Sequence, residues 1–213
     1  MKIRLWGERA LFAIPAYKVE ARSYPIPPPT AIEGLLRNLY WHPGFEWRLN
    51  RIAVNCPIVY ESVTRNMVQD IAPSQETLAA GKRYTIEDDR TQRTLSLLRN
   101  VDYTIDCALW HPEPIEQSRG NRITIERLQR GQHWAQPYLG QREFTAHLAL
   151  LPPDTKLRGH PTLGREMLLP VMPRAIRFTP KGTTVEWFQP TLRDGVLDLR
   201  NSERQESSDA TGT

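Results

Sequence analysis

The sequence predicts an α+β domain, and three observations lead to this prediction. Segments with strand alternation and segments with helical periodicity follow one another as strand, helix, strand, strand, helix, strand. Proline and glycine separate these segments. The 213 residues, 39% of them hydrophobic, suffice for one core. This order is that of the split βαβ, or ferredoxin-like, arrangement, which RNA-recognition (RRM) modules share.

The first strand and the first helix are separated by a proline-rich segment. Residues 2–12 alternate in the manner of a half-buried strand. The prolines that follow hold the chain extended, because proline fixes φ and restricts the residue before it. Thr30 and Glu33 then have the spacing of a capping box. We therefore expect a helix over about 31–40.

The second half of the domain repeats the pattern. Residues 46–60 are rich in β-branched side chains and predict one or two strands, and 101–110 alternate as a further strand. A short helix is expected near 122–130, with Gly131 as its C-cap. Residues 144–151 predict the last strand, which two prolines close.

These elements suggest a division of the chain. We expect the ferredoxin-like domain to span residues 1–152, with a protruding hairpin inserted at about 61–100, where the sequence is polar and rich in turn formers. Prolines and short apolar runs over 153–200 predict a small C-terminal antiparallel β-sheet extension. Residues 201–213 are small and polar, and we expect a disordered tail.

Arginine dominates the cations of the chain. Of 28 basic residues only five are lysines, and the formal net charge is +4. The guanidinium group suits phosphate and stacks on bases, although a GC-rich genome would also favour arginine. Between residues 119 and 142 there are five arginines and one acidic residue. This stripe indicates either a phosphate-binding surface or a solvated helix face.

Several other chemistries have no support in the sequence. Cys56 and Cys107 lie in apolar runs and are expected to be buried free thiols. There is no CxxC, HExxH, GxSxG or glycine-rich nucleotide fingerprint, and the histidines lack metal-ligand spacing. We therefore expect no metal and no cofactor, although ligands distant in sequence could converge.

The sequence also argues against a membrane location. No uncharged apolar run approaches the roughly 18–20 residues that span a bilayer. Charged residues interrupt the apolar stretch at the N-terminus, so it does not resemble a signal peptide. We expect a cytoplasmic protein with no membrane partner.

Four long segments of the chain match one known family. They are LYWHPGFEWRLNRI (39–52), VTRN (63–66), DDRTQRTLSLLRNVDYTI (88–105) and GQHWAQPYLGQREF (131–144). Together with the opening RLWGERALF and the Ser23-Tyr24-Pro25 turn, they resemble the CRISPR-associated Cas family five, subtype d, of type I-C (Dvulg). The segments keep the same order over roughly residues 3–150.

The resemblance implies a fold, an activity and partners. It implies a repeat-associated (RAMP) protein with an RRM-like domain and a C-terminal β-sheet extension. Such proteins grip the repeat-derived 5′ handle of CRISPR RNA within the type I-C Cascade surveillance complex. Many also cut the precursor RNA without metal, by attack of the ribose 2′-OH on the adjacent phosphate. The implied partners are a RAMP-type backbone subunit and a large subunit, with target DNA contacted indirectly.

The resemblance also implies catalytic residues. A metal-free cut needs a proton acceptor, a proton donor and a cation for the phosphorane charge. The tyrosine of the family's Tyr-Trp-x-Pro motif corresponds to Tyr40. The Lys-His pair that opens the family's second helix corresponds to the stretch Arg119-Gly120-Asn121-Arg122, so Arg122 is the expected cation and the expected histidine is absent.

That absence leaves alternatives open. Either Tyr40 and Arg122 act with another proton carrier, or the protein is a non-catalytic subunit that only binds the handle. His42 is one candidate carrier, but it could equally be a helix-end histidine that interacts with the helix dipole. His133 could be a structural turn residue, and Tyr40 could be packed in the core.

Candidate RNA contacts lie around the expected hairpin and in the last family segment. They are Arg65, Asn66, Arg90, Arg93, Arg99, Trp134, Tyr138 and Arg142. Arginine and asparagine suit phosphates and base edges, and aromatic rings can stack on bases. Alternatively, Asp88 and Asp89 pair with the hairpin arginines, and Trp134 packs beneath its loop. We expect these residues to line one common groove between the sheet and its projecting loops.

Overall fold

The computed structural model describes residues 1–68, 90–179 and 182–200. Its helices and strands are, in order, β1 (Lys2–Ala10), α1 (Pro29–Leu39), β2 (Glu46–Val54), β3 (Tyr60–Val68), β4 (Arg90–Trp110), α3 (Pro114–Arg130), β5 (His147–Leu151), the 3-10 helix η1 (Pro161–Leu163), β6 (Glu166–Leu168), β7 (Met172–Thr179), β8 (Gly182–Phe188), β9 (Thr191–Arg193) and β10 (Val196–Asp198). The mixture of one large antiparallel sheet with two helices confirms the α+β class.

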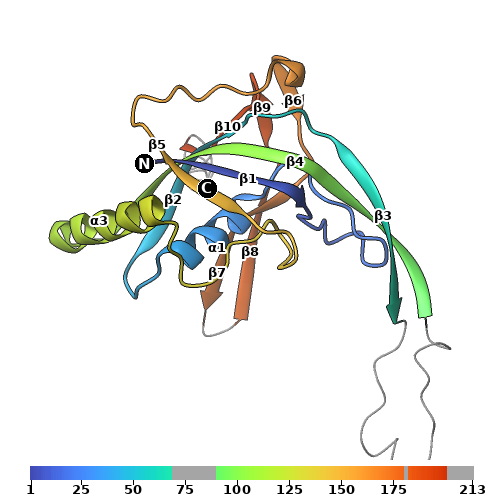
Figure 1. Ribbon diagram of the computed structural model, residues 1–213, viewed down its shortest axis with the longest axis horizontal. Coiled ribbons are helices and arrows are strands. Elements are labelled where there is room, and N and C mark those ends of the chain that lie inside the picture. The colour runs from blue at the N-terminus through green and yellow to red at the C-terminus, as the bar shows by residue number, and fades with distance from the viewer. Residues whose placement is uncertain (69–89, 180–181, 201–213) are drawn as a thin grey trace, which may run out of the picture.

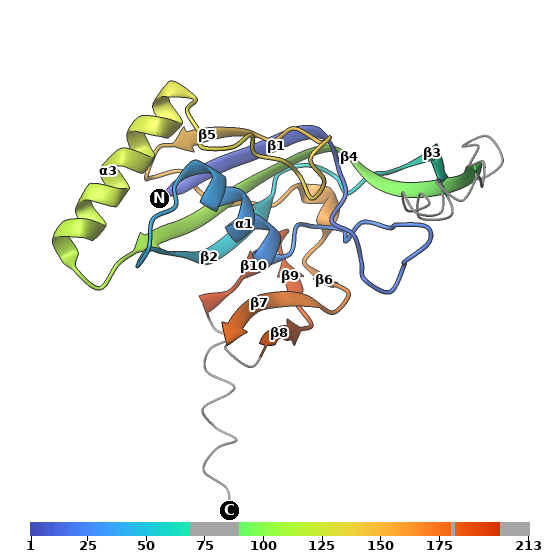
Figure 2. The same cartoon turned by 90° about the horizontal axis from the view of Figure 1, so that it is seen from below.

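The main sheet has eight strands in the order β5-β1-β4-β2-β10-β9-β6, and β3 pairs with β4 beside this path. Strand β1 pairs antiparallel with both β5 and β4, and β4 pairs antiparallel with β2. Helix α1 connects β1 to β2, and α3 connects β4 to β5. Figures 1 and 2 show both helices on the same side of the sheet.

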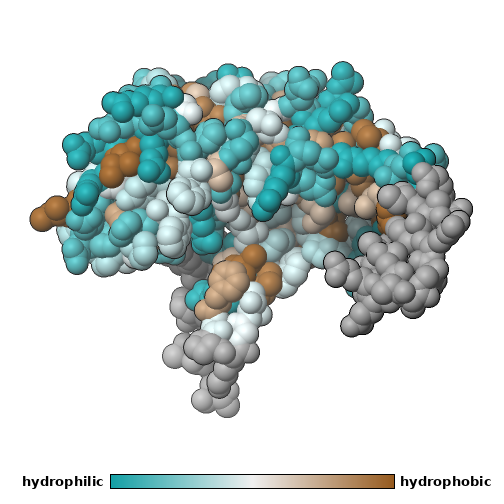
Figure 3. All heavy atoms as spheres, turned by 60° about the horizontal axis from the view of Figure 1, so that its bottom comes forward, coloured by the Kyte–Doolittle hydropathy of each residue, from teal (hydrophilic) through white to brown (hydrophobic). Residues whose placement is uncertain are grey.

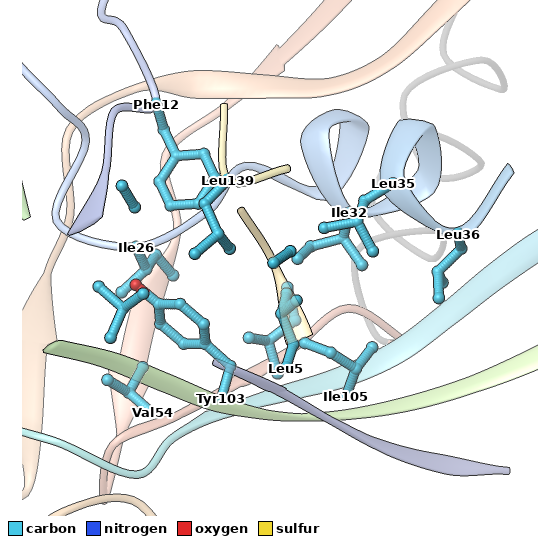
Figure 4. Close-up of a cluster of buried hydrophobic side chains, with 14 of the residues drawn as sticks. Leu5, Phe12, Ile26, Ile32, Leu35, Leu36, Val54, Tyr103, Ile105 and Leu139 are labelled. Carbon is cyan, nitrogen blue, oxygen red and sulfur yellow. The ribbon is translucent and has the colours of Figure 1, made fainter. Parts of the chain in front are cut away.

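The core lies between the sheet and this helical layer. Leu5 of β1 is paired in register with Tyr103 of β4, and neither side chain is more than 1% exposed. Ile32 and Leu36 of α1 cover them, also at 1% exposure (Figure 4). Each such side chain contributes about 1.5–3 kcal/mol by leaving water. The alternation of strands and the four-residue spacing of the helix therefore meet in one apolar layer.

Helix α1 begins without the capping box that the sequence suggested. Its N-cap is Pro28, no side chain caps it, and Thr30 lies within its first turn. The reason is Pro29 at the first helical position, where proline lacks an N–H to be capped and has a φ suited to a helix. The helix ends at Leu39, and Tyr40 returns to an extended conformation.

Helix α3 is longer than expected, because it begins at Pro114 rather than near residue 122. Its first half is polar, so apolar periodicity did not reveal it. The helix packs closely through Gly120, where a Cβ atom would lie 2.4 Å from the Phe45 ring. Gly131 closes the helix with φ 63°, which confirms the expected C-cap.

The expected C-terminal antiparallel sheet over 153–200 is found only in part, because three of the strands in this region extend the main sheet instead. Strand β10 pairs with β2, and β9 and β6 continue the main sheet from there. The edge of β2 would otherwise expose unpaired backbone groups, so the short strands are most stable there. Within residues 1–68, 90–179 and 182–200, β7 and β8 form a two-stranded sheet of their own. Figure 3 shows hydrophobic side chains on this protruding hairpin, where Phe178 is 76% exposed.

Strand β3 and the outer part of β4 form a ribbon that projects from the body (Figure 1). Its pairing runs from Tyr60 opposite Leu98 to Val68 opposite Arg90. The rest of the expected hairpin, with Asp88 and Asp89, lies outside the described residues, as does the expected tail. Among the residues that are described, no helix is long and apolar enough to cross a bilayer.

Candidate functional site

Tyr40 lies where α1 ends and the chain turns toward β2. Its side chain is 8% exposed, and Phe45 approaches it edge-on with 5.2 Å between ring centroids. The Trp47 indole N–H donates a hydrogen bond of 3.0 Å to the Tyr40 carbonyl. Tyr40 is therefore held at the border of the core by contacts on both its ring and its backbone.

The arginine beside Tyr40 is Arg127 of α3. Its guanidinium carbon lies 5.5 Å from the centre of the Tyr40 ring. One of its Nη atoms donates a hydrogen bond of 2.7 Å to the carbonyl of Leu39, at the C-terminal end of α1. Cations are favoured there by the unpaired carbonyls and the helix dipole. A fixed positive charge thus accompanies Tyr40.

The structure does not bring Arg122 to Tyr40. Gly120 and Thr124 are buried against the rest of the protein, and Arg122 is exposed. Because each helical residue rotates by about 100°, Arg122 lies on the opposite side of α3 from both of them. Arg127, five residues later, lies on their side. The expectation that Arg122 and Tyr40 act together is therefore not supported by their placement.

Two histidines lie against the same phenylalanine as Tyr40. His42 is exposed, and its ring centroid is 5.9 Å from that of Phe45. His111 follows the end of β4, is half-buried, and lies 4.6 Å from Phe45. Tyr40, His42 and His111 therefore gather around one aromatic ring, although they come from segments about 70 residues apart in sequence.

The segment 131–146, which we call the bridging loop, connects this region with the β3–β4 ribbon. The backbone N–H of Trp134 donates to the Asn38 carbonyl at 2.7 Å, beside Tyr40. Near its other end, the Glu143 carboxylate pairs with Arg65 of β3 at 2.6 Å. Gly140 packs so closely on the residues that follow β1 that a Cβ atom there would lie 2.0 Å from the Leu11 carbonyl oxygen. The loop is thus docked along its whole length.

The candidate arginines of the ribbon fall on two faces. Arg65 and Arg93 stand directly opposite each other on neighbouring strands. Asn66 and Arg90 are displaced by one and three residues and therefore point to the other face. Arg65 also lies over the Phe144 ring at 5.7 Å. The face with Arg65 and Arg93 is the one that meets the bridging loop.

The remaining candidates surround the same region. Trp134 is 85% exposed, so it does not pack beneath its loop. Tyr138 is half-buried and forms a backbone bridge with Thr145, while Arg142 is exposed. Arg99 lies opposite Arg9 at the base of the ribbon.

Two adjoining hollows connect these residues. One, of about 440 Å³, is lined by Trp6, Arg127 and His133 among others. The second, of about 380 Å³, is lined by Arg9, Arg65 and Glu143 among others. Both hollows include Thr145 and His147, so they form one continuous trough from α3 to the ribbon. Of the eight candidate RNA contacts, only Arg65 lines these hollows, and Arg99 lines a third hollow together with Arg9. The expectation that all the candidates share one groove is therefore not borne out by the described residues.

The lining of the trough includes three arginines (Arg9, Arg65 and Arg127) and two glutamates (Glu8 and Glu143), so acidic residues balance most of its positive charge. Arg9 pairs with Glu61 at 2.8 Å, and this hydrogen bond is the largest cause that lowers the pKa of the Glu61 carboxyl. Glu143 balances Arg65 in the same way. Such exposed pairs contribute little to stability, about 0–1 kcal/mol each, so an incoming phosphate can replace them at small cost.

The sequence did not identify two of these residues as site residues. Arg9 lies beside Arg99 only because β1 and β4 pair in this register. Arg127 belongs to the basic stripe over 119–142. Had the full length of α3 been predicted, the spacing of Arg127 from Gly120 and Thr124 would have placed it on the buried face of the helix.

Neither metal ligation nor thiol chemistry is evident in the described part of the chain. No cluster of three or more histidine, cysteine or acidic residues is placed to hold a metal ion among these residues. Cys56 and Cys107 are free thiols, as expected. Burial raises the pKa of the Cys107 thiol to about 12 and also raises the pKa of the half-buried Cys56 thiol. Both thiols are protonated at neutral pH.

Solved structures of CRISPR-associated proteins share this fold. One described as a CRISPR-associated protein aligns with TM-score 0.67 at 17% identity, covering 95% of this chain and 92% of the other. A functionally uncharacterized Streptococcus mutans protein, SMU1763c, aligns with TM-score 0.67 at 16% identity, covering 95% and 93%. A chain of a CRISPR RNA-guided surveillance complex aligns with TM-score 0.54 at 15% identity, covering 97% of each chain.

Sequence comparison is more specific. The family model described as CRISPR-associated protein Cas_Cas5, of the Cas5d type, matches residues 1–189. The CRISPR pre-crRNA endoribonuclease Cas5d of Mannheimia succiniciproducens is 32% identical over 214 residues, covering 93% of this chain and 94% of the relative. That of Thermus thermophilus is 35% identical over 156 residues, covering 72% and 64%. The chain belongs to the Cas5d family, which confirms the resemblance found in the sequence.

Proposed function

We propose that this protein cuts precursor CRISPR RNA and then holds the repeat-derived 5′ handle as a subunit of a Cascade surveillance complex. Relatives over nearly the whole chain are named pre-crRNA endoribonucleases. A structural neighbour belongs to an RNA-guided surveillance complex. The single observation that carries the proposal is the contact of Tyr40 with Arg127, which itself lines one end of the trough.

The fold supports this function in its finer detail. The strand order β5-β1-β4-β2, with α1 and α3 on one side, supports a ferredoxin-like, RRM-like domain over residues 1–152. Residues 153–200 then form the family's C-terminal β extension, in part as a continuation of the main sheet. Since precursor transcripts are made in the cytoplasm, we place the protein there.

The proposed reaction needs no metal. The ribose 2′-oxygen attacks the neighbouring phosphorus, the bond from phosphorus to the 5′-oxygen breaks, and a 2′,3′-cyclic phosphate remains. Tyr40 supplies a hydroxyl proton to the leaving 5′-oxygen. Arg127, rather than Arg122, offsets the negative charge that develops, because it is the arginine beside Tyr40.

RNA binding is proposed along the trough and the ribbon face that joins it. The residues proposed for it are Arg65, Arg93, Arg99, Trp134, Tyr138 and Arg142. Arginines bind phosphates, and the exposed Trp134 ring stacks on a base. Asn66 and Arg90 contribute only if the RNA wraps around the ribbon. The backbone subunit and the large subunit of Cascade are the proposed protein partners.

Incubating the full chain with its own repeat RNA in EDTA tests the proposal. We expect one cut, which Tyr40→Phe abolishes without loss of handle binding, while Tyr17→Phe at a 47% exposed position cuts normally. Arg127→Ala should slow the cut by about 10²-fold or more, the effect of losing one charge-stabilising donor. Arg122→Ala, on the other side of the same helix, should not.

A binding subunit without nuclease activity is the second candidate, because the family's helix-opening histidine is absent. Tight, salt-sensitive handle binding with no cut by the wild-type chain would establish that alternative. A chain that neither cuts nor binds its repeat RNA would contradict both candidates.

A further inference from the structure

We propose that His42 and His111 form the proton-handling pair of the cleavage site, with His42 as the base and His111 as the hydrogen-bond donor to the phosphate. The inference rests on the proposed nuclease function and deepens it. Histidine is the side chain best suited to proton transfer near neutral pH.

The first argument is convergence. His42 follows α1, and His111 follows β4, yet both rings contact Phe45. His42 meets it at 88° and His111 at 37°, while Tyr40 meets it at 82°. Tyrosine and two histidines therefore surround one apolar ring, which fixes their spacing.

The second argument is the room that two glycines leave. Gly44 has φ +86°, and a Cβ atom there would lie 2.9 Å from Nε2 of His111. A side chain at this position would cover the free nitrogen of the ring. Gly120 allows Phe45 to sit against α3, where a Cβ atom would lie 2.4 Å from its ring. The two glycines thus allow Phe45 to pack on α3 and His111 to pack against the backbone at Gly44 without a side chain over its Nε2 atom.

The third argument is the protonation of the two rings. Nδ1 of His42 lies 3.0 Å from the Pro43 carbonyl oxygen, which can only accept, so the proton of the neutral ring is on Nδ1. Nδ1 of His111 instead accepts a hydrogen bond of 3.1 Å from the backbone N–H of Glu113. In the neutral forms, His42 therefore offers a lone pair at Nε2, and His111 offers an N–H at Nε2.

These opposite forms match the two tasks. The 2′-OH proton passes to Nε2 of His42 as the bond from O2′ to phosphorus forms. Nε2–H of His111 donates a hydrogen bond to a non-bridging phosphate oxygen. The 5′-oxygen leaves with the proton of the Tyr40 hydroxyl, and the proton on His42 returns to Tyr40 through solvent, so the residues end as they began.

The charged neighbours of the cluster are compatible with this scheme. Arg127 of α3 lies beside Tyr40 and favours its transient anion. Glu46, next to Phe45 in sequence, is paired with Arg48 at 3.2 Å. Glu113 contributes its backbone N–H to His111.

The test compares single-turnover cleavage of the repeat RNA by the full chain and its histidine variants. We expect His42→Ala to cut about 10²–10⁴-fold more slowly, the usual effect of losing a general base, with handle binding unchanged. Added imidazole should restore part of its activity. The wild-type rate should rise with pH as the general base loses its proton, and His42→Ala should lose this rise.

His111→Ala should slow the cut by about 10²-fold, again without loss of binding, as for a missing transition-state donor. If the His111→Ala variant fails to fold, His111→Asn is used in its place, because the asparagine side chain can still accept the hydrogen bond from the Glu113 backbone N–H. His160→Ala, at a histidine that accepts a hydrogen bond from Thr162 near η1, is the matched control and should cut normally.

The outcomes separate the two proposals. A wild-type chain that cuts, with folded His42 and His111 variants that cut at the same rate and with the same pH profile, overturns the histidine assignment alone. Slow His42→Ala cleavage that imidazole does not restore and whose pH profile is unchanged also overturns it. A wild-type chain that does not cut overturns the nuclease proposal and this inference together.

Discussion

Glu33 of α1 is a half-buried carboxyl group whose stability effect depends on pH. The pKa of the Glu33 carboxyl is raised to about 7, and burial is the largest cause. The positive charge of Arg37 acts in the opposite direction, and the negative charge of Glu46 adds to the increase. A carboxyl whose pKa is higher in the folded than in the unfolded state favours folding most when protonated. Its contribution is therefore fully present below about pH 4.5 and is lost as the pH rises through about 7.

Glu33→Gln should remove this loss. We expect the variant to match the wild type at about pH 4.5 and to exceed its free energy of unfolding at pH 8 by about 1–3 kcal/mol, since each pKa unit corresponds to about 1.4 kcal/mol. Urea unfolding at both pH values measures the difference. Glu20→Gln, at an exposed position, is the control, and an equal effect of both variants would contradict the assignment.

The residues proposed for catalysis show how much of the site could be predicted residue by residue. Tyr40 was found from a short motif at a helix end, and the structure places it beside a cation. Arg122 was chosen as that cation, but it faces away from Tyr40 because of its position on α3. Which of the two arginines faces Tyr40 depends on their angular positions around α3. The sequence did not show these positions, because the polar first half of the helix has no apolar periodicity.

At the scale of elements, the β3–β4 ribbon has two chemically different faces. Arg65 and Arg93 face the bridging loop, and Asn66 and Arg90 face away from it. Like charges directly opposite each other are unfavourable unless an anion lies between them. In this structure the Glu143 carboxylate pairs with Arg65, and under the proposed RNA binding a phosphate takes its place.

Arg93→Ala should weaken handle binding and make it less dependent on salt. For single-stranded RNA, losing one phosphate contact lowers the slope of log affinity against log salt by about 0.7. Filter binding at several salt concentrations measures the slope. Arg193→Ala, an equal charge change at the far end of the sheet, should leave the slope unchanged. An unchanged slope in Arg93→Ala would remove this ribbon face from the binding surface.

The bridging loop is the element whose role could not be derived from local sequence. Its aromatic and basic residues were identified, and Trp134 was expected to be either packed or exposed. Its backbone contact with Asn38 and the Glu143 pair with Arg65 join segments that are about 80–100 residues apart. Such contacts depend on long-range docking, which local periodicity does not encode.

At the scale of the whole molecule, three of the C-terminal strands, β6, β9 and β10, are part of the main sheet. Val196 and Leu197 of β10 pair with β2, and Leu192 and Leu197 are at most 2% exposed. Leu163, from η1, belongs to the same buried cluster. The residues beyond 152 therefore complete the core that the first strands begin.

Truncation after residue 152 should prevent stable folding. Losing several buried side chains at about 1.5–3 kcal/mol each removes most of the roughly 5–15 kcal/mol that stabilises a typical domain. Circular dichroism and urea unfolding test this expectation, with a chain that ends at residue 200 as the control. A cooperative unfolding transition in the 1–152 fragment would contradict it.

The sequence by itself determined the order of strands and helices, the family and the position of Tyr40 after α1. These features follow from local periodicity, from proline and glycine, and from motifs contiguous in the chain. Only the tertiary structure decided that Arg127 meets Tyr40, that Arg65 and Arg93 share a face, and that β10 joins β2. These outcomes depend on helix rotation, strand register and edge pairing, which bring distant residues together through the packing of the whole core.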